Sequence, residues 1–377
     1  MPTGNWLDKS EEPKKQKLRE PSGGYLMKAT FEPSRLLIVR NDRVGDLVLT
    51  MPTFEYVRKA FPAAQISVLT SSRTSVLLKQ VDCVDQVLAD DPSWSTRQLA
   101  GRLRKEQFDA VLVINAKTRN YLAAWLAGIP VRVTWARRPA GWLFGNRYVT
   151  LRRSHPPIHE SEFALAFARV LRADSSIEIS SPELRLAPEI VARVASRIRT
   201  DLGVGRPLFG VHPGNYNSAW NWPADRYFQL IVQLARYGSV IVTGGPGEEG
   251  LLAQLKQGLP ADLVRRVAFY CDFDLEELSA ALSLCDVLTV SNTGPMHVAS
   301  VLGTPVVALF GSQLWQCPAK WAPLGKNNTV LQAPLLPHEE PLPEKEHEYM
   351  CRIALEEVVE ANLQAVQTRT VQEPRCA

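Results

Sequence analysis

The stretch LLIVRNDRVGDLVLTMP, from Leu36 to Pro52, decides the fold class because it turns from a strand into a helix within a few residues. Leu36–Val39 is a short apolar run typical of a buried strand, and the apolar spacing over Leu47–Ala60 predicts a helix. Between them lie Gly45 and Asp46, with two arginines just before them. In open parallel sheets, ligands bind where strands end and helices begin, so this turn is a candidate for chemistry.

The same alternation of short apolar strands and amphipathic helices continues, which predicts an α/β protein with two doubly wound parallel sheets. The expected strands are Leu36–Val39, Gln65–Leu69, Gln86–Leu88, Ala110–Ile114, Val131–Thr134, Tyr148–Thr150, Leu208–Val211, Ser239–Val242, Val267–Phe269, Val287–Val290 and Val306–Phe310. The expected helices are Leu47–Ala60, Ser95–Glu106, Glu160–Leu171, Ala224–Tyr237, Glu248–Gln257, Asp274–Leu284, Met296–Leu302 and Leu355–Val366. A polar, proline-containing stretch after Leu171 predicts a linker. We place the domains at residues 31–180 and 181–350, with a last helix and tail over 351–377.

The composition is that of a globular protein, and 377 residues are enough for two domains. Six scattered cysteines without a C-x-x-C pair argue against a disulfide framework or a cysteine zinc site, and fit a reducing cytosol. No apolar run approaches the roughly 18 residues of a transmembrane helix. Residues 1–30 are polar and predict a disordered tail, or a start set too early, with Met27 as the alternative initiator.

Three loops that follow predicted strands contain glycine and suit a diphosphate. The first is VSNTGPMHVAS, from Val290 to Ser300, where the start of a helix offers free N–H groups and the positive end of its dipole. Thr293 adds a hydroxyl and His297 a ring nitrogen, although an ordinary capped helix with a satisfied histidine explains the pattern equally well. The other two loops are GVHPGNYNSAWNWP, from Gly210, and VTGGPGEEG, from Val242.

Other nucleotide and metal motifs are absent or weak. The sequence contains no G-x-G-x-x-G fingerprint, which disfavours a nicotinamide oxidoreductase, and no Walker A motif. The D-x-D triplet Asp272–Asp274 resembles a divalent metal site, but a capping box with Asp274 as N-cap and Glu277 at the third helical position is the better explanation.

The charges gather in one half of the chain. No acidic residue lies between Asp109 and Glu160. The basic residues in this stretch are Lys117, Arg119, Arg132, Arg137, Arg138, Arg147, Arg152 and Arg153, and large aromatic residues are frequent among them. Such a field predicts an anionic partner, and arginines mixed with aromatics also suit a membrane surface. A solvated basic face over an aromatic core is the simpler alternative, and no nucleic-acid-binding signature supports nucleic acid.

Together these motifs resemble glycosyltransferase family 9, the ADP-heptose:lipopolysaccharide heptosyltransferases. The resemblance runs from about Arg35 to Val366 and includes the opening stretch, HPGNYNSAWNWP, VTGGPGEE, LSLCDVLTVSNTGPMHVASVLGTPVVALFG and CRIALEEVVEAN. It implies a GT-B fold, with an N-terminal acceptor domain, a C-terminal nucleotide-sugar domain and a last helix that returns to the first domain. It also implies inverting transfer without an essential metal or cofactor, in the cytoplasm or at the cytoplasmic face of the inner membrane.

The resemblance assigns roles to particular residues. Asp46 is expected to be the catalytic base, with Asp42 as a second carboxylate nearby; a helix N-cap is the alternative role of Asp46. The expected donor-binding residues are His212, Gly214, Trp220, Gly244, Gly245, Asn292, Thr293, Gly294, Met296 and His297. The expected acceptor-binding residues are Arg43, Arg73, Lys117, Arg119, Arg137 and Arg138. Lys117 and Arg119 come first among these because they follow a predicted strand.

Two positions depart from the family pattern, and both touch the donor. Trp220 stands where the family usually has a lysine for the donor phosphates, and Asn292 stands where it often has an aspartate for sugar hydroxyls. A lost cation weakens stabilisation of the leaving group, and an amide accepts fewer hydrogen bonds than a carboxylate. Another donor sugar, another glycan acceptor, or a relative that binds without transfer therefore remain alternatives to heptose transfer.

Overall fold

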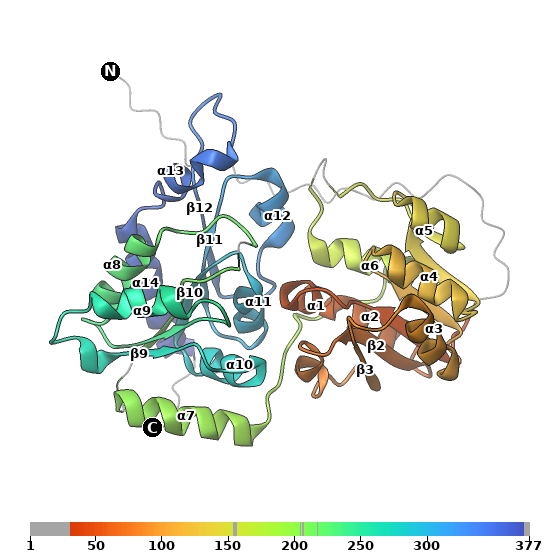
Figure 1. The fold of residues 1–377 in the computed structure, drawn as a ribbon, viewed down its shortest axis with the longest axis horizontal. Helices are drawn as coiled ribbons and strands as arrows, with labels where there is room; N and C mark the ends of the chain where they lie inside the picture. Colours follow the sequence, from red (N-terminus) through yellow and green to blue (C-terminus); the bar gives the residue numbers. More distant parts are fainter. Residues whose placement is uncertain (1–30, 154–156, 204, 206, 217, 373–377) are drawn as a thin grey trace. The chain divides into compact units, whose positions relative to one another are not determined.

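The structure is a computed structural model that describes residues 31–153, 157–203, 205, 207–216 and 218–372 (Figure 1). The predictions for residues 1–30 and for the extreme C-terminal tail lie outside the described residues. The helices of the described part include none that is both long and apolar enough to cross a membrane.

The first sheet has six parallel strands in the order β3-β2-β1-β4-β5-β6. Its strands are β1 (Arg35–Val39), β2 (Gln65–Ser71), β3 (Gln86–Asp90), β4 (Ala110–Val113), β5 (Val131–Trp135) and β6 (Arg147–Val149). The central strands are apolar at every position from Leu36 to Val39 and across β4, because helices cover both faces of the sheet.

The second sheet repeats this arrangement, in the order β12-β11-β10-β7-β8-β9. Its strands are β7 (Leu208–His212), β8 (Ser239–Thr243), β9 (Val267–Tyr270), β10 (Val287–Ser291), β11 (Val306–Phe310) and β12 (Asn328–Gln332). Each sheet reverses its strand order once, between β1 and β4 in the first and between β7 and β10 in the second. The prediction of two doubly wound α/β units is confirmed, and these two reversals are where ligands are expected.

The helices that join the strands are as follows. In the first half they are α1 (Val44–Val48), α2 (Met51–Ala60), α3 (Thr96–Lys105), α4 (Thr118–Leu126), α5 (Pro139–Phe144) and α6 (Glu160–Leu171). In the second half they are α7 (Pro188–Leu202), α8 (Ala224–Leu234), α9 (Glu249–Gln257), α10 (Leu275–Leu284), α11 (Gly294–Val301), α12 (Pro318–Trp321), α13 (Glu346–Met350) and α14 (Leu355–Gln372). Short 3₁₀ turns occur at Ser75–Leu78, Val264–Arg266, Leu314–Gln316 and Pro343–Lys345.

Three expectations about the helices are corrected by the structure. The single helix expected over Leu47–Ala60 is two helices, α1 and α2, because Pro52 has no N–H to continue the first one. Helices α4, α5, α7, α12 and α13, and the edge strand β12, were not expected. The third correction concerns α14, which was expected to return to the first half.

Helix α14 packs on the second sheet instead, against α8, β10 and β11. Its apolar residues Leu355, Val358 and Ala361 belong to the same buried cluster as Trp222. The buried Asn362 adds a hydrogen bond at 2.9 Å between its Oδ1 and the hydroxyl of Thr289. These contacts use the apolar face of α14 within the second half, so the expected return to the first half is wrong.

Candidate functional site

A cavity of about 600 Å³ opens at the carboxyl ends of strands from both sheets. The loop after β1 and the start of α1 contribute Asp42 to Asp46, and the loop after β2 contributes Arg73. The loops after β7, β8 and β10 contribute His212, Gly245 and the start of α11. A volume of this size is usual for the site of a small molecule or cofactor.

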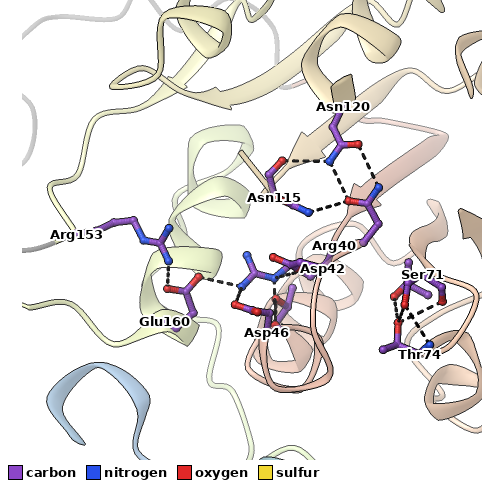
Figure 2. Close-up of polar contacts among 12 residues, drawn as sticks. Arg40, Asp42, Asp46, Ser71, Thr74, Asn115, Asn120, Arg153 and Glu160 are labelled. Carbon is purple, nitrogen blue, oxygen red and sulfur yellow. Dashed lines mark hydrogen bonds and ion pairs between the residues drawn. The ribbon is translucent and has the colours of Figure 1, made fainter. Parts of the chain in front are cut away.

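The floor of this site on the first sheet is built around one buried guanidinium, that of Arg40 (Figure 2). Its nitrogens lie 3.2 Å from Asp42 Oδ1, 2.6 Å from Asp46 Oδ1 and 2.9 Å from Glu160 Oε1. Glu160, the first residue of α6, also accepts a hydrogen bond from Arg153. One cation therefore holds the loop after β1, the helix α1 and the start of α6 together.

The pKa values of the carboxylates around Arg40 are shifted in different directions. Burial raises the pKa of Asp42 to about 6, although Arg40 opposes this rise. Burial also raises the pKa of Asp46, with Glu160 adding to the rise and Arg40 opposing it. Burial acts in the same direction on Glu160, but Arg40 and Arg153 outweigh it and hold its pKa below the ordinary value. Glu160 is thus the lasting counter-ion of Arg40, whereas Asp46 is closer to accepting a proton.

Asp46 lies in the first turn of α1 and has some exposure to the cavity. The N-cap of α1 is Arg43, so the alternative that Asp46 caps this helix is wrong. Its neighbour Gly45 is needed for a close approach: a Cβ there would lie 2.7 Å from Cδ2 of His297 in α11. Helix α1, which carries Asp46, and helix α11 therefore touch at a glycine.

A second polar cluster fixes the ends of β1, β3 and β4 beside this site. The side-chain amide of Asn41 donates to Asp90 Oδ2 at 2.6 Å, and its oxygen accepts from Asn115 at 2.9 Å and Asn120 at 2.8 Å. Asp90 is also paired through both carboxylate oxygens with Arg119. Because these buried groups satisfy one another, they hold the strand ends in one arrangement.

The second sheet brings neutral and backbone groups to the cavity. Burial lowers the pKa of His212 to about 4, and its Nδ1 lies 2.8 Å from the hydroxyl of Thr243. The N–H of Gly245 donates to Glu248 at 2.7 Å. A Cβ on Gly214 would overlap the same Glu248 carboxylate, at 2.1 Å. Glu248 was not expected, yet it joins the two glycine loops assigned to the donor.

The start of α11 faces the cavity as the sequence predicted. Thr293 is its N-cap in extended conformation and makes no side-chain capping bond. Pro295 has no N–H, and the Met296 N–H donates to the Thr293 carbonyl at 3.1 Å, so Gly294, which lines the cavity, is the residue of this first turn whose backbone N–H can serve a ligand. Burial lowers the pKa of His297 to about 3, and its buried Nδ1 has no hydrogen-bond partner among the residues that the structure describes. The amide of Asn292 donates to the Gln316 carbonyl at 3.3 Å. Neutral rings and a helix start of this kind suit an anionic ligand.

The predicted donor residues divide into two groups. His212, Gly245, Asn292, Thr293, Gly294 and His297 line the cavity. Gly214, Trp220, Gly244 and Met296 lie outside its lining. Trp220 is 5% exposed and stacks on Tyr349, with ring centroids 5.4 Å apart, so its ring is part of the core.

The predicted acceptor residues also divide. Arg43 and Arg73 line the cavity. Lys117, Arg119, Arg137 and Arg138 lie outside its lining, and Arg119 is engaged by Asp90 as described above. Lys117 and Arg119 follow β4 as expected, but neither lines this cavity, and their proposed contact with the acceptor stays a prediction.

The sequence also missed four residues that line the cavity from the segment after β11: Trp315, Gln316, Lys320 and Trp321. This segment follows the strand next to β10, so the rule that sites gather at carboxyl ends of strands is the signal that would have found it.

The D-x-D triplet has structural roles. Asp272 pairs with Arg197 at 2.9 Å, and Asp274 caps α10 in a capping box with Glu277, as predicted. Within the described part of the chain, no three histidine, cysteine or acidic residues are grouped so that they could hold a metal ion.

Comparison with known proteins identifies related chains. Glycosyltransferase family 9 (heptosyltransferase) matches residues 96–350. Lipopolysaccharide heptosyltransferase 2 of Salmonella typhimurium is 25% identical over 292 residues, covering 74% of this chain and 82% of that protein. Lipooligosaccharide heptosyltransferase 2 of Haemophilus influenzae is 24% identical, covering 79% and 88%. The structure of E. coli ADP-heptose lipopolysaccharide heptosyltransferase II aligns with a TM-score of 0.75 at 21% identity, over 89% of this chain and 99% of that one.

The ion pairs of Arg40 predict a large difference between two glutamates of α6. Glu160→Gln removes the charge that neutralises both Arg40 and Arg153, so it should destabilise the protein by about 3–5 kcal/mol, the usual cost of breaking a buried pair. Urea denaturation followed by tryptophan fluorescence measures this loss. The matched control is Glu162→Gln, which removes a partly exposed pair with Arg169 and should change stability by less than about 0.5 kcal/mol. An equal loss of unfolding free energy in the two variants would show that the buried charge of Arg40 does not need Glu160 as its counter-ion.

Proposed function

The chain belongs to glycosyltransferase family 9, the heptosyltransferases, and from this we propose that it transfers heptose from ADP-heptose to an inner-core acceptor of lipopolysaccharide. We assign acceptor binding to residues 31–180 and nucleotide-sugar binding to residues 181–350. The observation that carries the proposal is that Asp46 and the start of α11 line one cavity. A base and an anion site on the same cavity are what glycosyl transfer from a nucleotide-sugar requires.

The donor diphosphate is proposed to bind at the start of α11. Thr293 and Gly294 offer their backbone N–H groups there, and His212 and His297 present neutral rings. The relatives support the choice of nucleotide, since the structure aligned above is that of an ADP-heptose heptosyltransferase. Asn292 in place of an aspartate leaves a different sugar as the second candidate.

The proposed reaction places Asp46 at the acceptor. Its carboxylate takes the proton of the acceptor hydroxyl while that oxygen forms a bond to the anomeric carbon. The bond from this carbon to the diphosphate breaks on the opposite face, its electron pair leaves with ADP, and the centre is inverted. The raised pKa of Asp46 favours this role, because a base works best when its pKa approaches the working pH.

Asp46→Asn tests the base directly. The change is nearly isosteric, so the fold and the affinity for ADP should be kept, while turnover should fall by about two to four orders of magnitude. The measurement is the rate of heptose transfer to a deacylated inner-core acceptor, at saturating donor and equal folded fraction.

Two further results separate Asp46 from its neighbours. Asp42→Asn, which changes a nearby charge, should keep most of the turnover. Wild-type turnover should be lost as pH falls through the pKa of Asp46, because the base must be ionised, and this loss should occur above the ordinary range of an aspartate since that pKa is raised. Near-normal turnover in Asp46→Asn with loss in Asp42→Asn would move the base to Asp42.

Transfer is also proposed to need no metal. Asp272 and Asp274, the acidic pair closest to a metal-binding pattern, are already engaged by Arg197 and by the cap of α10. Titration calorimetry should therefore give the same affinity for ADP with and without EDTA. Loss of ADP binding in EDTA, restored by Mg²⁺, would overturn this part of the proposal.

The acceptor side is proposed to dock on an anionic membrane, at the cytoplasmic face of the inner membrane. On α5, Trp142 and Leu143 are 66% and 63% exposed, next to the exposed Arg138. The hydroxyl of Tyr148 donates to the Trp142 carbonyl at 3.0 Å, so a further aromatic ring joins this surface. Apolar side chains that insert and arginines that bind lipid headgroups are the usual parts of such a surface.

The double change Trp142→Ser with Leu143→Ser should lower binding to anionic vesicles at least about tenfold, because it removes most of the inserted apolar area. Co-sedimentation with vesicles containing phosphatidylglycerol measures this. Leu336→Ser is the matched control, since Leu336 is also 63% exposed but lies in the second half. If the control lowered binding as much as the double variant, α5 would not be the docking element.

A further inference from the structure

The cavity lacks a cation at the position where family members usually have one for the donor phosphates. That position is Trp220, whose ring is buried and stacked on Tyr349. A negatively charged leaving group still develops there in the proposed reaction, and such a charge is strongly stabilised by a positioned cation. The remaining basic residues of the cavity are Arg43, Arg73 and Lys320.

Lys320 is the one of these three that comes from the second half. It lies in α12, in the segment that follows β11, and its side chain is half-buried. No ion pair of Lys320 is found among the described residues of the chain. Its ammonium nitrogen lies 5.2 Å from the centre of the Trp321 ring. An ammonium held in a cavity without a carboxylate partner is available for an anionic ligand.

Lys320 lines the same cavity as the proposed base and the start of α11. Burial and Arg153 lower its pKa, whereas Glu160 and Asp46 raise it, so these groups are near enough to act on its charge. The lining of this cavity also contains Thr293 and Gly294, where the proposed function places the donor diphosphate. A cation on the same cavity can therefore act on the charge of the diphosphate.

The segment that carries Lys320 is anchored at both ends. Before it, Gln316 donates to the Ser218 carbonyl at 2.9 Å and accepts from the N–H of Trp220 at 3.2 Å. After it, the Ala322 carbonyl lies 3.0 Å from Nε2 of His159. These bonds tie α12 to the loop after β7 and to the start of α6, so Lys320 is held at the cavity rather than on a free surface.

We propose that the Lys320 ammonium binds the donor diphosphate and stabilises the charge that collects on it as the glycosidic bond breaks, in place of the lysine that Trp220 replaces. This inference rests on the proposed function. The lysine transfers no proton: the electron pair of the broken bond goes to the diphosphate oxygen, and the acceptor proton goes to Asp46.

Lys320→Met tests the inference, because it keeps most of the apolar stem and removes only the charge. Titration calorimetry with ADP, UDP and inorganic pyrophosphate should show about tenfold weaker binding or more, whereas adenosine, which has no phosphate, should bind as to the wild type. With a donor that supports transfer, turnover at saturation should fall about a hundredfold, since the charge on the leaving group is largest in the transition state. Lys320→Arg should recover part of both losses.

Lys326→Met is the control, since Lys326 is exposed in the same segment and lies outside the cavity lining. It should leave all these values unchanged. Wild-type binding of diphosphates that persists undiminished in Lys320→Met would overturn the role of Lys320 and leave the proposed function intact. A wild-type protein that binds none of the diphosphates would overturn the proposed function, and the role of Lys320 with it.

Discussion

The buried guanidinium of Arg40 is the interaction on which the first half of the site depends. A charge at that depth is tolerated only when carboxylates surround it, and here they come from the loop after β1, from α1 and from α6. Three segments must therefore meet at one point for the protein to fold. The same requirement places Asp46 at the cavity, because its carboxylate is a partner of Arg40 and Asp46 is also an acidic residue of α1 that lines the cavity.

This arrangement also separates the tasks of two acidic groups that share one cation. Glu160 makes ion pairs with two arginines and keeps its charge, while Asp46 has only a share of Arg40 and is pushed toward neutrality by burial and by Glu160. A pair of carboxylates with opposite pKa shifts is a recurring sign of acid–base chemistry. Arg40 thus fixes the position of the proposed base without holding it permanently ionised.

The strands and the main loops could be predicted from the sequence, because a buried parallel strand leaves an apolar run that is local. The break at Pro52 was also visible locally and was missed only because the apolar period continues across it. The buried counter-ion of Arg40 could not be predicted in this way, since Glu160 lies 120 positions from Arg40 along the chain. Arg119 shows the converse: its place after β4 suggested a ligand contact, but Asp90 engages it. Position in the sequence predicted which residues lie at the carboxyl-end edge of the sheet. It could not predict which of their side chains form hydrogen bonds and ion pairs with one another.

The two sheets bring different chemistry to the cavity, and this asymmetry follows from burial. The first sheet supplies charged groups that are paired within a network, whereas the second supplies neutral histidines and backbone N–H groups around His212 and Thr293. Backbone N–H groups and a cation both stabilise the charge that the diphosphate gains when the bond breaks. A positioned cation would add to what the neutral groups of this site supply. Since Trp220 has become part of the core with Tyr349, the cation has to come from another segment, and α12 is the element of the second half that brings one to the cavity.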